Sequence, residues 1–280
     1  MARKAKRGGN RAAVRRLEGK AYKANGWLIA SLSFLVVGPL MACGGVNVFG
    51  SDGPGVCCCF VGIFSPFVAL GGLLLMGGDR ARWNRALGFA REGDDLSLDY
   101  TEEPGRSAAA FLRGCATIGD AEHELCRNRL EGSYRGRRVR VMDYRSGYGG
   151  SNVVARTTVV WDGEARGVPR LALYPRGWRQ KLADAVGAGG GSIRLAGERE
   201  FHDAYVLQGA DADAVAACFT DDLIGLCLEE RSLVVEALDG SLLVYWDGEE
   251  FPPADLPGRL ATALRVLKLL TPRAEFDEGD

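Results

Sequence analysis

The residues best suited to metal chemistry in this chain are Cys115, His123 and Cys126. The spacing of His123 and Cys126 would place both side chains on one face of a helix. A structural zinc site takes four ligands, however, and the chain has only one further histidine, His202. We therefore expect two buried thiols beside an exposed histidine, and we predict neither a metal ion nor another cofactor.

Two adjacent pairs could serve acid–base chemistry, His202-Asp203 and Asp143-Tyr144. We expect the first pair on a strand, where neighbouring side chains point to opposite faces. The second pair ends a strand-like run, and we interpret it as an edge or interface pair. The glycine-rich stretch at 187–191 lacks the Gly-Lys-Ser/Thr ending of a phosphate loop, so we expect a flexible connection. No hydrolase, zincin, Walker or kinase pattern occurs, and we predict no catalytic residue.

The 280 residues nearly balance 35 Lys and Arg against 36 Asp and Glu, but the charge is unevenly placed. Residues 1–26 hold nine basic residues and one acid, a net charge of +8. Residues 27–77 hold one acid and no Lys or Arg, whereas 78–280 hold 26 basic and 34 acidic residues, a net charge of −8. This distribution excludes a single soluble globule, a disordered chain and a strongly basic nucleic-acid-binding domain.

Two apolar stretches predict a pair of transmembrane helices, at about 27–49 and 56–76. Each stretch reaches the length of roughly 20 residues that a helix needs to cross a bilayer, and neither contains a charge. The connection Gly50–Gly55 consists largely of turn-forming residues. We therefore expect a helical hairpin at 27–77 that crosses the membrane twice.

Positive charge on both sides of the hairpin predicts its orientation, because short flanks rich in Lys and Arg remain in the cytoplasm. The connecting loop carries no Lys or Arg, so both termini are expected to be cytoplasmic. The chain has 29 Arg and six Lys, a ratio typical of a GC-rich bacterial genome. Together with the two predicted spans, this ratio indicates a multi-pass protein of the bacterial inner membrane. The basic residues expected next to the membrane are Arg15, Arg16, Lys20, Lys23, Arg80, Arg82 and Arg85.

The N-terminal region leaves two alternatives open. Leu40–Gly44 resembles a bacterial lipoprotein cleavage box, and cleavage there would make Cys43 a lipidated N-terminus. We favour the uncleaved hairpin, because the basic region is long for a signal peptide and a second apolar stretch follows at once. For the tail at 1–26 we expect a solvated, partly disordered arm; the alternative is a basic helix over Arg11–Lys23 on anionic lipid.

The chain after the hairpin predicts an α+β domain with a mainly antiparallel sheet and an amphipathic C-terminal helix. Tight hairpin turns are indicated at Arg135-Gly136 and Asp239-Gly240. The last helix, about Leu256–Leu270, has an apolar stripe that should cover the sheet. The expected regions are a basic tail (1–26), the transmembrane hairpin (27–77), a membrane-proximal helical connector (78–125), the α+β domain (126–271) and an acidic tail (272–280).

Apolar periodicity predicts the further elements of this part of the chain. The expected strands are Leu96–Tyr100, Arg127–Tyr134, Arg137–Tyr144, Asn152–Trp161, Leu171–Tyr174, Ile193–Leu195, Tyr205–Leu207, Leu233–Ala237 and Leu242–Trp246. The expected helices are Arg80–Arg91, Ser107–Arg113, Trp178–Val186, Ala212–Phe219 after an Asp211 cap, and Asp221–Leu228 after a Thr220 cap.

Several of these segments resemble an uncharacterised bacterial membrane-protein family with an N-terminal hydrophobic hairpin and a cytoplasmic α+β domain. The resemblance covers about 80–270 and the hairpin before it, and rests on Leu130–Val139, Met142–Tyr144, Thr157–Val160, Phe201, Tyr205–Gly209 and Leu242–Tyr245. The chain departs from the family pattern at Val154-Ala155-Arg156, where His or Gln is common. The family has no established activity, so the resemblance implies a layout and no mechanism.

We therefore expect a membrane-anchored cytoplasmic binding or scaffolding module without catalysis, whose partners are the lipid bilayer and a membrane or cytoplasmic protein. An exposed sheet edge or the groove beside the last helix would form the contact surface. One alternative is a membrane-surface enzyme of unknown chemistry, with Asp143, Arg140 or His202 converging in a pocket. The other is a lipid-binding PH-like module, against which the acidic charge argues. Nucleic acid is not an expected partner, because aromatic residues are sparse and the domain is acidic.

Overall fold

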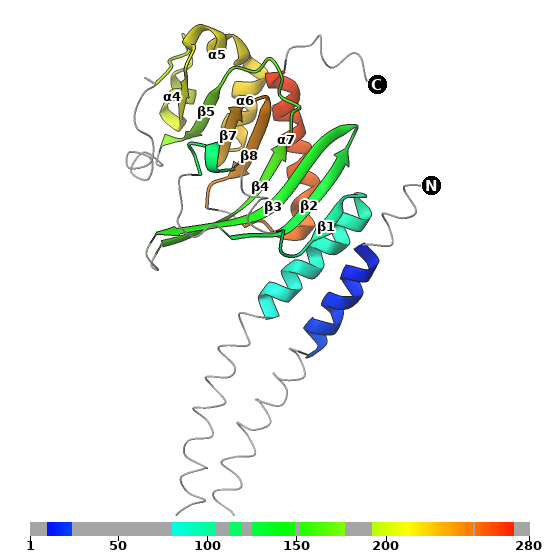
Figure 1. Cartoon of the computed structure of the whole chain (residues 1–280). Coiled ribbons are helices and arrows are strands. Elements are labelled where there is room, and N and C mark those ends of the chain that lie inside the picture. The colour runs from blue at the N-terminus through cyan, green and yellow to red at the C-terminus, as the bar shows by residue number, and fades with distance from the viewer. Residues whose placement is uncertain are drawn as a thin grey trace, which may run out of the picture. The chain divides into compact units, whose positions relative to one another are not determined.

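The computed structural model describes residues 10–23, 80–104, 112–118, 125–148, 152–176, 192–248 and 250–271 (Figure 1). The predicted hairpin at 27–77, His123, the predicted helix Trp178–Val186, the stretch at 187–191 and the tail at 272–280 lie outside these ranges. Within them, no helix is both long enough and apolar enough to cross a membrane. The chain divides into two compact units, Arg11–Gly88 and the combination of Met1–Asn10 with Phe89–Asp280.

The larger unit contains an eight-stranded antiparallel sheet, which confirms the predicted α+β class. The strand order is β1-β2-β3-β4-β8-β7-β5-β6, and all seven pairings are antiparallel. The strands are β1 (Asp99–Thr101), β2 (Leu125–Tyr134), β3 (Arg137–Tyr148), β4 (Asn152–Trp161), β5 (Leu171–Pro175), β6 (Tyr205–Gly209), β7 (Leu233–Leu238) and β8 (Ser241–Trp246).

Helices precede, interrupt and follow these strands. The helices at 10–23 and 80–95 precede the sheet, and the first of them replaces the loose arm that we expected for the N-terminal tail. The others are η2 (Leu112–Gly114), α4 (Arg199–Ala204), α5 (Ala212–Cys218), α6 (Asp221–Glu229), η4 (Pro253–Asp255) and α7 (Leu256–Leu270).

Both predicted tight turns occur where the sequence placed them. Arg135 and Gly136 join β2 to β3 with φ angles of 48° and 80°, and Asp239 and Gly240 join β7 to β8 with φ angles of 50° and 72°. Positive φ at both central residues is the backbone of a type I′ turn, whose twist matches that of the flanking strands. The turn residues therefore fix the register of both hairpins.

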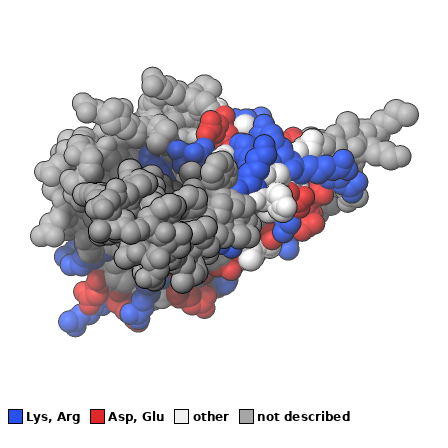
Figure 2. Space-filling view, turned by 90° about the horizontal axis from the view of Figure 1, so that it is seen from below, with Lys and Arg blue, Asp and Glu red and all other residues white. Residues whose placement is uncertain are grey.

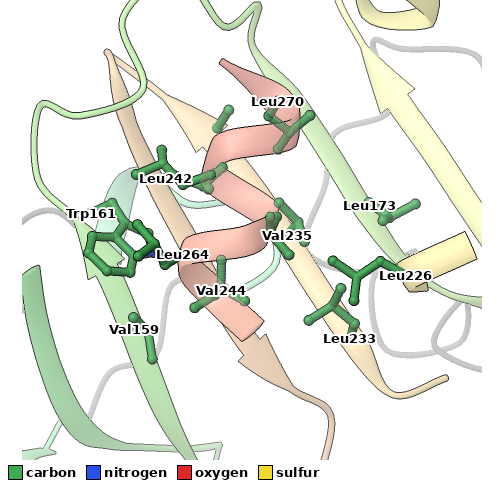
Figure 3. Packing of buried hydrophobic residues seen from close by; sticks show 14 of the residues in the cluster. Val159, Trp161, Leu173, Leu226, Leu233, Val235, Leu242, Val244, Leu264 and Leu270 are labelled. Carbon is green, nitrogen blue, oxygen red and sulfur yellow. The ribbon is translucent and has the colours of Figure 1, made fainter. Parts of the chain in front are cut away.

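The C-terminal helix α7 packs on the sheet, as its apolar stripe predicted, and its bounds are the expected ones. Figure 3 shows Leu264 and Leu270 projecting from α7 among buried residues of the strands, such as Trp161 and Leu242. All four side chains belong to the larger hydrophobic cluster of the domain. Burial of this surface, at about 25 cal/mol per Å², is the main force that holds α7 in place.

A second, smaller hydrophobic cluster lies on the other face of the sheet. Successive residues of β8 alternate between the clusters: Leu242 and Val244 belong to the first, Leu243 and Tyr245 to the second. The described segment 112–118, which includes η2, contributes side chains to the second cluster. Strand β8 is thus buried on both faces.

Each outermost strand of the sheet has part of its free edge occupied by another segment of the described structure. At β1, the Asn10 side-chain amide donates to the carbonyl oxygen of Leu98 at 2.5 Å and accepts from the Tyr100 N–H at 2.9 Å. At β6, the Ile193 N–H donates to the Leu207 carbonyl oxygen at 2.8 Å. Both contacts satisfy backbone groups that a partner strand would otherwise use.

Some local expectations were wrong. The segment expected as a strand at 193–195 forms only an isolated bridge, from Ser192 to Gln208. The pair His202-Asp203 lies in the six-residue helix α4, which is too short to show helical periodicity in sequence. Thr220 occupies the position before α6 as predicted, but its side chain makes no capping hydrogen bond, whereas the Asp211 cap of α5 is confirmed.

Candidate functional site

The helices at 10–23 and 80–95 bring together basic residues that the sequence placed next to the membrane. Within the unit Arg11–Gly88, the Lys20 ammonium lies 4.1 Å from the centre of the Trp83 ring. The Arg82 guanidinium carbon lies 4.9 Å from the same centre. The helix ends that are nearest in sequence to the apolar stretches are therefore neighbours (Figure 1).

This helix pair carries a dense positive charge. The 22 described residues of the unit include eight Lys or Arg and one acid, Glu18, which gives a net charge of +7. Lys and Arg atoms are prominent on the described surface seen from below in Figure 2. Of the seven predicted membrane-proximal residues, the exposed ones are Arg15, Arg16, Lys23 and Arg80, and the half-buried ones are Lys20, Arg82 and Arg85.

An exposed aromatic residue lies in the same part of the helix pair. Tyr22 is 80% exposed and precedes Lys23, whereas Leu17 of the same helix is fully buried. Tyr and Trp are enriched where a protein meets the boundary between lipid and water, because each ring is apolar with one polar atom. Tyr22 and Trp83 therefore match the chemistry of a membrane interface.

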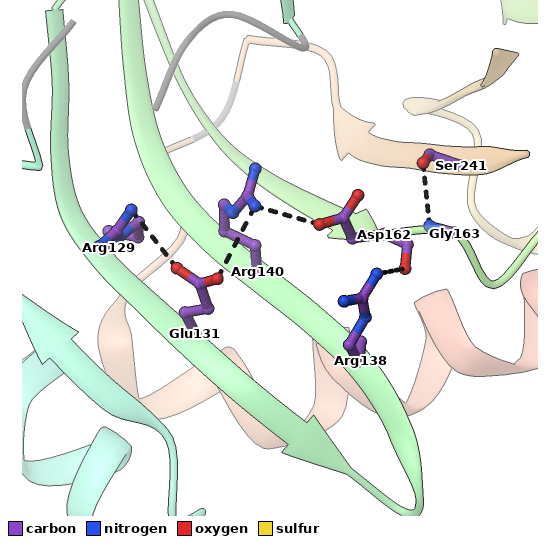
Figure 4. A network of polar contacts seen from close by, with 7 residues as sticks. All are labelled: Arg129, Glu131, Arg138, Arg140, Asp162, Gly163 and Ser241. Atoms are coloured by element: carbon purple, nitrogen blue, oxygen red, sulfur yellow. Dashed lines mark hydrogen bonds and ion pairs between the residues drawn. The ribbon is translucent and has the colours of Figure 1, made fainter. Parts of the chain in front are cut away.

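A strip of paired charges crosses β2, β3 and the end of β4 (Figure 4). Arg140 lies 3.8 Å from Glu131 and 3.1 Å from Asp162, and Glu131 lies 3.4 Å from Arg129. Arg138 donates to the Asp162 carbonyl oxygen at 3.2 Å. These five residues are called the charged strip below. Ion pairs between partly exposed side chains of this kind add little to stability.

A buried carboxylate, Glu236 of β7, holds the segment 112–118 on the second face of the sheet. One oxygen of Glu236 accepts from the Ala116 N–H at 2.6 Å, and the other accepts from the Thr117 N–H at 2.9 Å and the Thr117 hydroxyl at 2.7 Å. Only 2% of Glu236 is exposed. Burial raises the pKa of Glu236, and the hydrogen bonds from Thr117 and Ala116 oppose that rise.

Arg156 of β4 and Tyr245 of β8 bind the same segment. The Tyr245 hydroxyl donates to the Thr117 carbonyl oxygen at 3.0 Å, and an Arg156 nitrogen lies 3.4 Å from that oxygen. The Arg156 guanidinium carbon also lies 4.7 Å from the centre of the Tyr245 ring. Burial raises the pKa of Tyr245, so the phenol remains a donor. Glu236, Arg156 and Tyr245 thus bind all three polar groups of Thr117.

A separate polar chain surrounds Asp143. Its two oxygens accept from the Asn128 amide and the Thr157 hydroxyl, both at 2.8 Å, and the Tyr100 hydroxyl donates to Asn128 at 3.0 Å. A β-bulge between Arg127 and Leu130 places Asn128 there, with a φ of 52°. Asp143 and Tyr144 are buried in the sheet, so the predicted edge or interface pair is wrong.

His202 takes part in local structure around α4. Its ring nitrogen Nε2 accepts from the Leu195 N–H at 2.8 Å, and its carbonyl oxygen accepts from the Arg176 guanidinium. The structure therefore does not bring together Asp143, Arg140 and His202, the three residues that the enzyme alternative placed in one pocket. Asp143 belongs to the polar chain with Asn128, and Arg140 belongs to the charged strip.

Of the two cysteines in the candidate metal cluster, Cys115 is buried as expected, whereas Cys126 is only half-buried. Cys115 and Cys126 both pack in or against the second hydrophobic cluster, and neither forms a disulfide. Burial raises the pKa of the Cys115 thiol, which keeps it protonated and unreactive. Among the described residues, no three His, Cys, Asp or Glu side chains form a group that could hold a metal ion.

Sequence reasoning missed Glu236 and Arg156, although a signal for each was present. Both are single charged residues inside apolar strand runs, at Leu233–Leu238 and Asn152–Trp161. A charge at such a position requires a buried partner. Arg156 also occupies the place where the chain departs from the family pattern, and the structure gives that position a polar role.

Three comparisons with known proteins complete the description of the site. No protein-family model, no curated protein and no solved structure matches this chain. The resemblance of 80–270 to the bacterial membrane-protein family therefore stays a prediction.

Proposed function

We propose that the chain is a membrane-anchored, non-catalytic binding module on the cytoplasmic face of the bacterial inner membrane. The observation that supports this most is the contact of Lys20 with Trp83. It places the helix that leads into the apolar stretch beside the helix that follows it. A chain that leaves and returns at neighbouring points crosses the membrane an even number of times, as a hairpin at 27–77 would.

Charge supports the cytoplasmic side. The 22 described residues of the unit Arg11–Gly88 hold a net charge of +7, and positive flanks of transmembrane segments remain in the cytoplasm. Residues 78–280 together have a net charge of −8, which disfavours contact of this whole region with anionic lipid. The helix pair is therefore the part of the described chain that faces the membrane.

The non-catalytic part of the proposal rests on where the candidate groups lie. Asp143, Arg140 and His202 belong to three different networks, so the enzyme alternative lacks the convergence that it required. A PH-like barrel would close its strands into a barrel, whereas β1 and β6 form two separate ends of this strand order. The strand order therefore gives the PH-like alternative no support.

We assign the partner surface to the charged strip. Asn10 and the segment around Ile193 each occupy part of a sheet edge, which leaves less of either edge open to a partner strand. The strip keeps Glu131 and Asp162 more than a third exposed, at 44% and 38% of their side chains. A protein with complementary charges is the partner that this surface suits.

Reporter insertions test the topology. A fluorescent protein fused after Asp280 should fluoresce, and alkaline phosphatase inserted at Asp52 should be active, because the phosphatase needs the oxidising side of the membrane. Alkaline carbonate should leave the chain in the membrane. An active phosphatase after Asp280, or extraction by carbonate, would refute the anchored topology. Intact mass would detect cleavage before Cys43.

Photo-crosslinking tests the partner surface. A photoreactive amino acid at Glu131 or Asp162 should yield a recurring cross-linked protein in intact membranes. The matched controls are Arg199 in α4 and Arg265 in α7, which are exposed positions outside the strip. The same product at the controls, or none at the strip, would contradict the assignment.

A further inference from the structure

We propose that the helices at 10–23 and 80–95 form a binding site for the phosphate-containing headgroups of anionic glycerophospholipids. This inference rests on the membrane anchoring proposed above, and it adds the ligand of the helix pair. The observations that carry it are the charge of the two helices, the cations around Trp83 and the exposure of Tyr22.

The position of the charges in the chain puts them within reach of the headgroups. Lys23 lies four residues before Trp27, and Arg80 lies four residues after Met76. Four residues span about 6 Å in a helix and at most about 14 Å when extended. The headgroup region of one leaflet is about 5–8 Å thick. Anchoring at 27–77 therefore holds Lys23 and Arg80 in or next to this layer.

Two cations gather at one aromatic ring in this site. Lys20 and Arg82 lie 4.1 Å and 4.9 Å from the centre of Trp83, within the range of a cation–π interaction. Both side chains are cations of the kind that bind phosphate groups. The indole ring itself prefers the headgroup level of a bilayer. Trp83 thus organises a site for a phosphate at the membrane surface.

Tyr22 distinguishes a lipid from a soluble polyanion as the ligand. Its ring is 80% exposed beside Lys23, and a bilayer surface offers such a ring both apolar and polar contacts. Nucleic-acid sites interleave several aromatic residues with the basic ones for base stacking. The 22 described residues of the unit Arg11–Gly88 contain only Tyr22 and Trp83 as aromatic residues. An anionic lipid surface is therefore the favoured ligand.

Native mass spectrometry of the full chain in uncharged detergent tests the site. The chain is titrated with phosphatidylglycerol and, separately, with phosphatidylcholine, and bound lipids are counted. We expect tighter binding of phosphatidylglycerol. The triple variant Arg15→Gln, Lys23→Gln, Arg80→Gln should weaken it by about a hundredfold, since each basic residue contributes about fivefold. The control variant Arg199→Gln, Arg231→Gln, Arg265→Gln removes the same charge from exposed positions of the other unit and should bind like the wild type.

The possible results separate this inference from the anchoring. Equal binding of both lipids by a chain that resists carbonate extraction would overturn the headgroup site and leave the anchor intact. Equal losses in both triple variants would overturn it as well, because the effect would then be net charge alone. A DNA oligonucleotide that displaces the lipid at lower concentration would reassign the site to nucleic acid. A charge-preserving variant, Arg15→Lys, Lys23→Arg, Arg80→Lys, should keep the preference; its loss would also overturn the site.

Discussion

Replacement of Thr117 by Val should loosen the segment 112–118 without changing the shape of its side chain. The Thr117 hydroxyl donates to a Glu236 oxygen at 2.7 Å, and valine puts a methyl group in its place. Glu236 keeps the Ala116 and Thr117 N–H groups as donors, at 2.6 Å and 2.9 Å. One hydrogen bond to a buried carboxyl group is therefore lost, which costs about 1–3 kcal/mol.

Hydrogen exchange measures this loss where it occurs. The two amides that bind Glu236 exchange only when the segment opens, so their exchange rates report the local free energy of opening. In the full chain in detergent, Thr117→Val should accelerate exchange of the Ala116 and Thr117 amides about 5- to 150-fold, the rate equivalent of about 1–3 kcal/mol. Thr262→Val on α7 is the matched control and should leave these amides unchanged.

A double-mutant cycle separates the hydrogen bond from side effects of either substitution. If Thr117 acts through Glu236, then Thr117→Val should have a smaller effect in a Glu236→Gln background than in the wild type. Equal effects in both backgrounds would refute the coupling. Unchanged exchange in the single variant would refute the view that the polar contacts hold the segment.

Three further predictions concern ionisation, the sheet edge and the core. Burial raises the pKa of Glu236 above its ordinary value of 4.5. The difference in free energy of unfolding between the wild type and Glu236→Gln should therefore fall as the pH rises above 4.5, and it should level off above the raised pKa. A difference that stays constant with pH in denaturation experiments would contradict this. Asn10→Ala removes both contacts to β1 and should cost about 1–2 kcal/mol in the exchange protection of the Tyr100 amide, with no change in α6. Leu264→Ala should lower the free energy of unfolding by about 2–5 kcal/mol, whereas the neighbouring exposed Arg265→Ala should change it by less than about 0.5 kcal/mol; similar losses in both would show that α7 does not pack as described.

The elements that sequence predicted well are those with local signals. The turns at Arg135-Gly136 and Asp239-Gly240 need residues that accept positive φ, and such residues are visible without a structure. The helix Leu256–Leu270 repeats its apolar positions over four turns, which is long enough for the period to be unambiguous. Helix α4 has six residues, too few to show such a period, so the sequence around His202 does not indicate a helix.

The polar sites escaped prediction because their partners are distant in sequence. Glu236 binds Ala116 and Thr117, which precede it by 120 and 119 residues. A charged residue in an apolar strand indicates that a buried partner exists, but it does not identify the partner residue. The pairing of β4 with β8 could not be predicted for the same reason, since neither strand contains a local signal that identifies the other as its partner. The basic residues beside the apolar stretches were easier to assign, because charge and position along the chain sufficed to propose their role, although a helix at 10–23 was not the favoured expectation.

The pairing of β4 with β8 also has a consequence for the time during which the protein is made. Strand β4 ends at Trp161, and β8 begins only at Ser241. At a synthesis rate of about 5–20 residues per second, the ribosome needs about 4–16 seconds to make the intervening chain. During that interval, β4 lacks its native partner on the edge that pairs with β8 in the finished sheet. Nascent chains are thus most prone to wrong strand pairing at the centre of the sheet, and the final edges at β1 and β6 are not the critical ones.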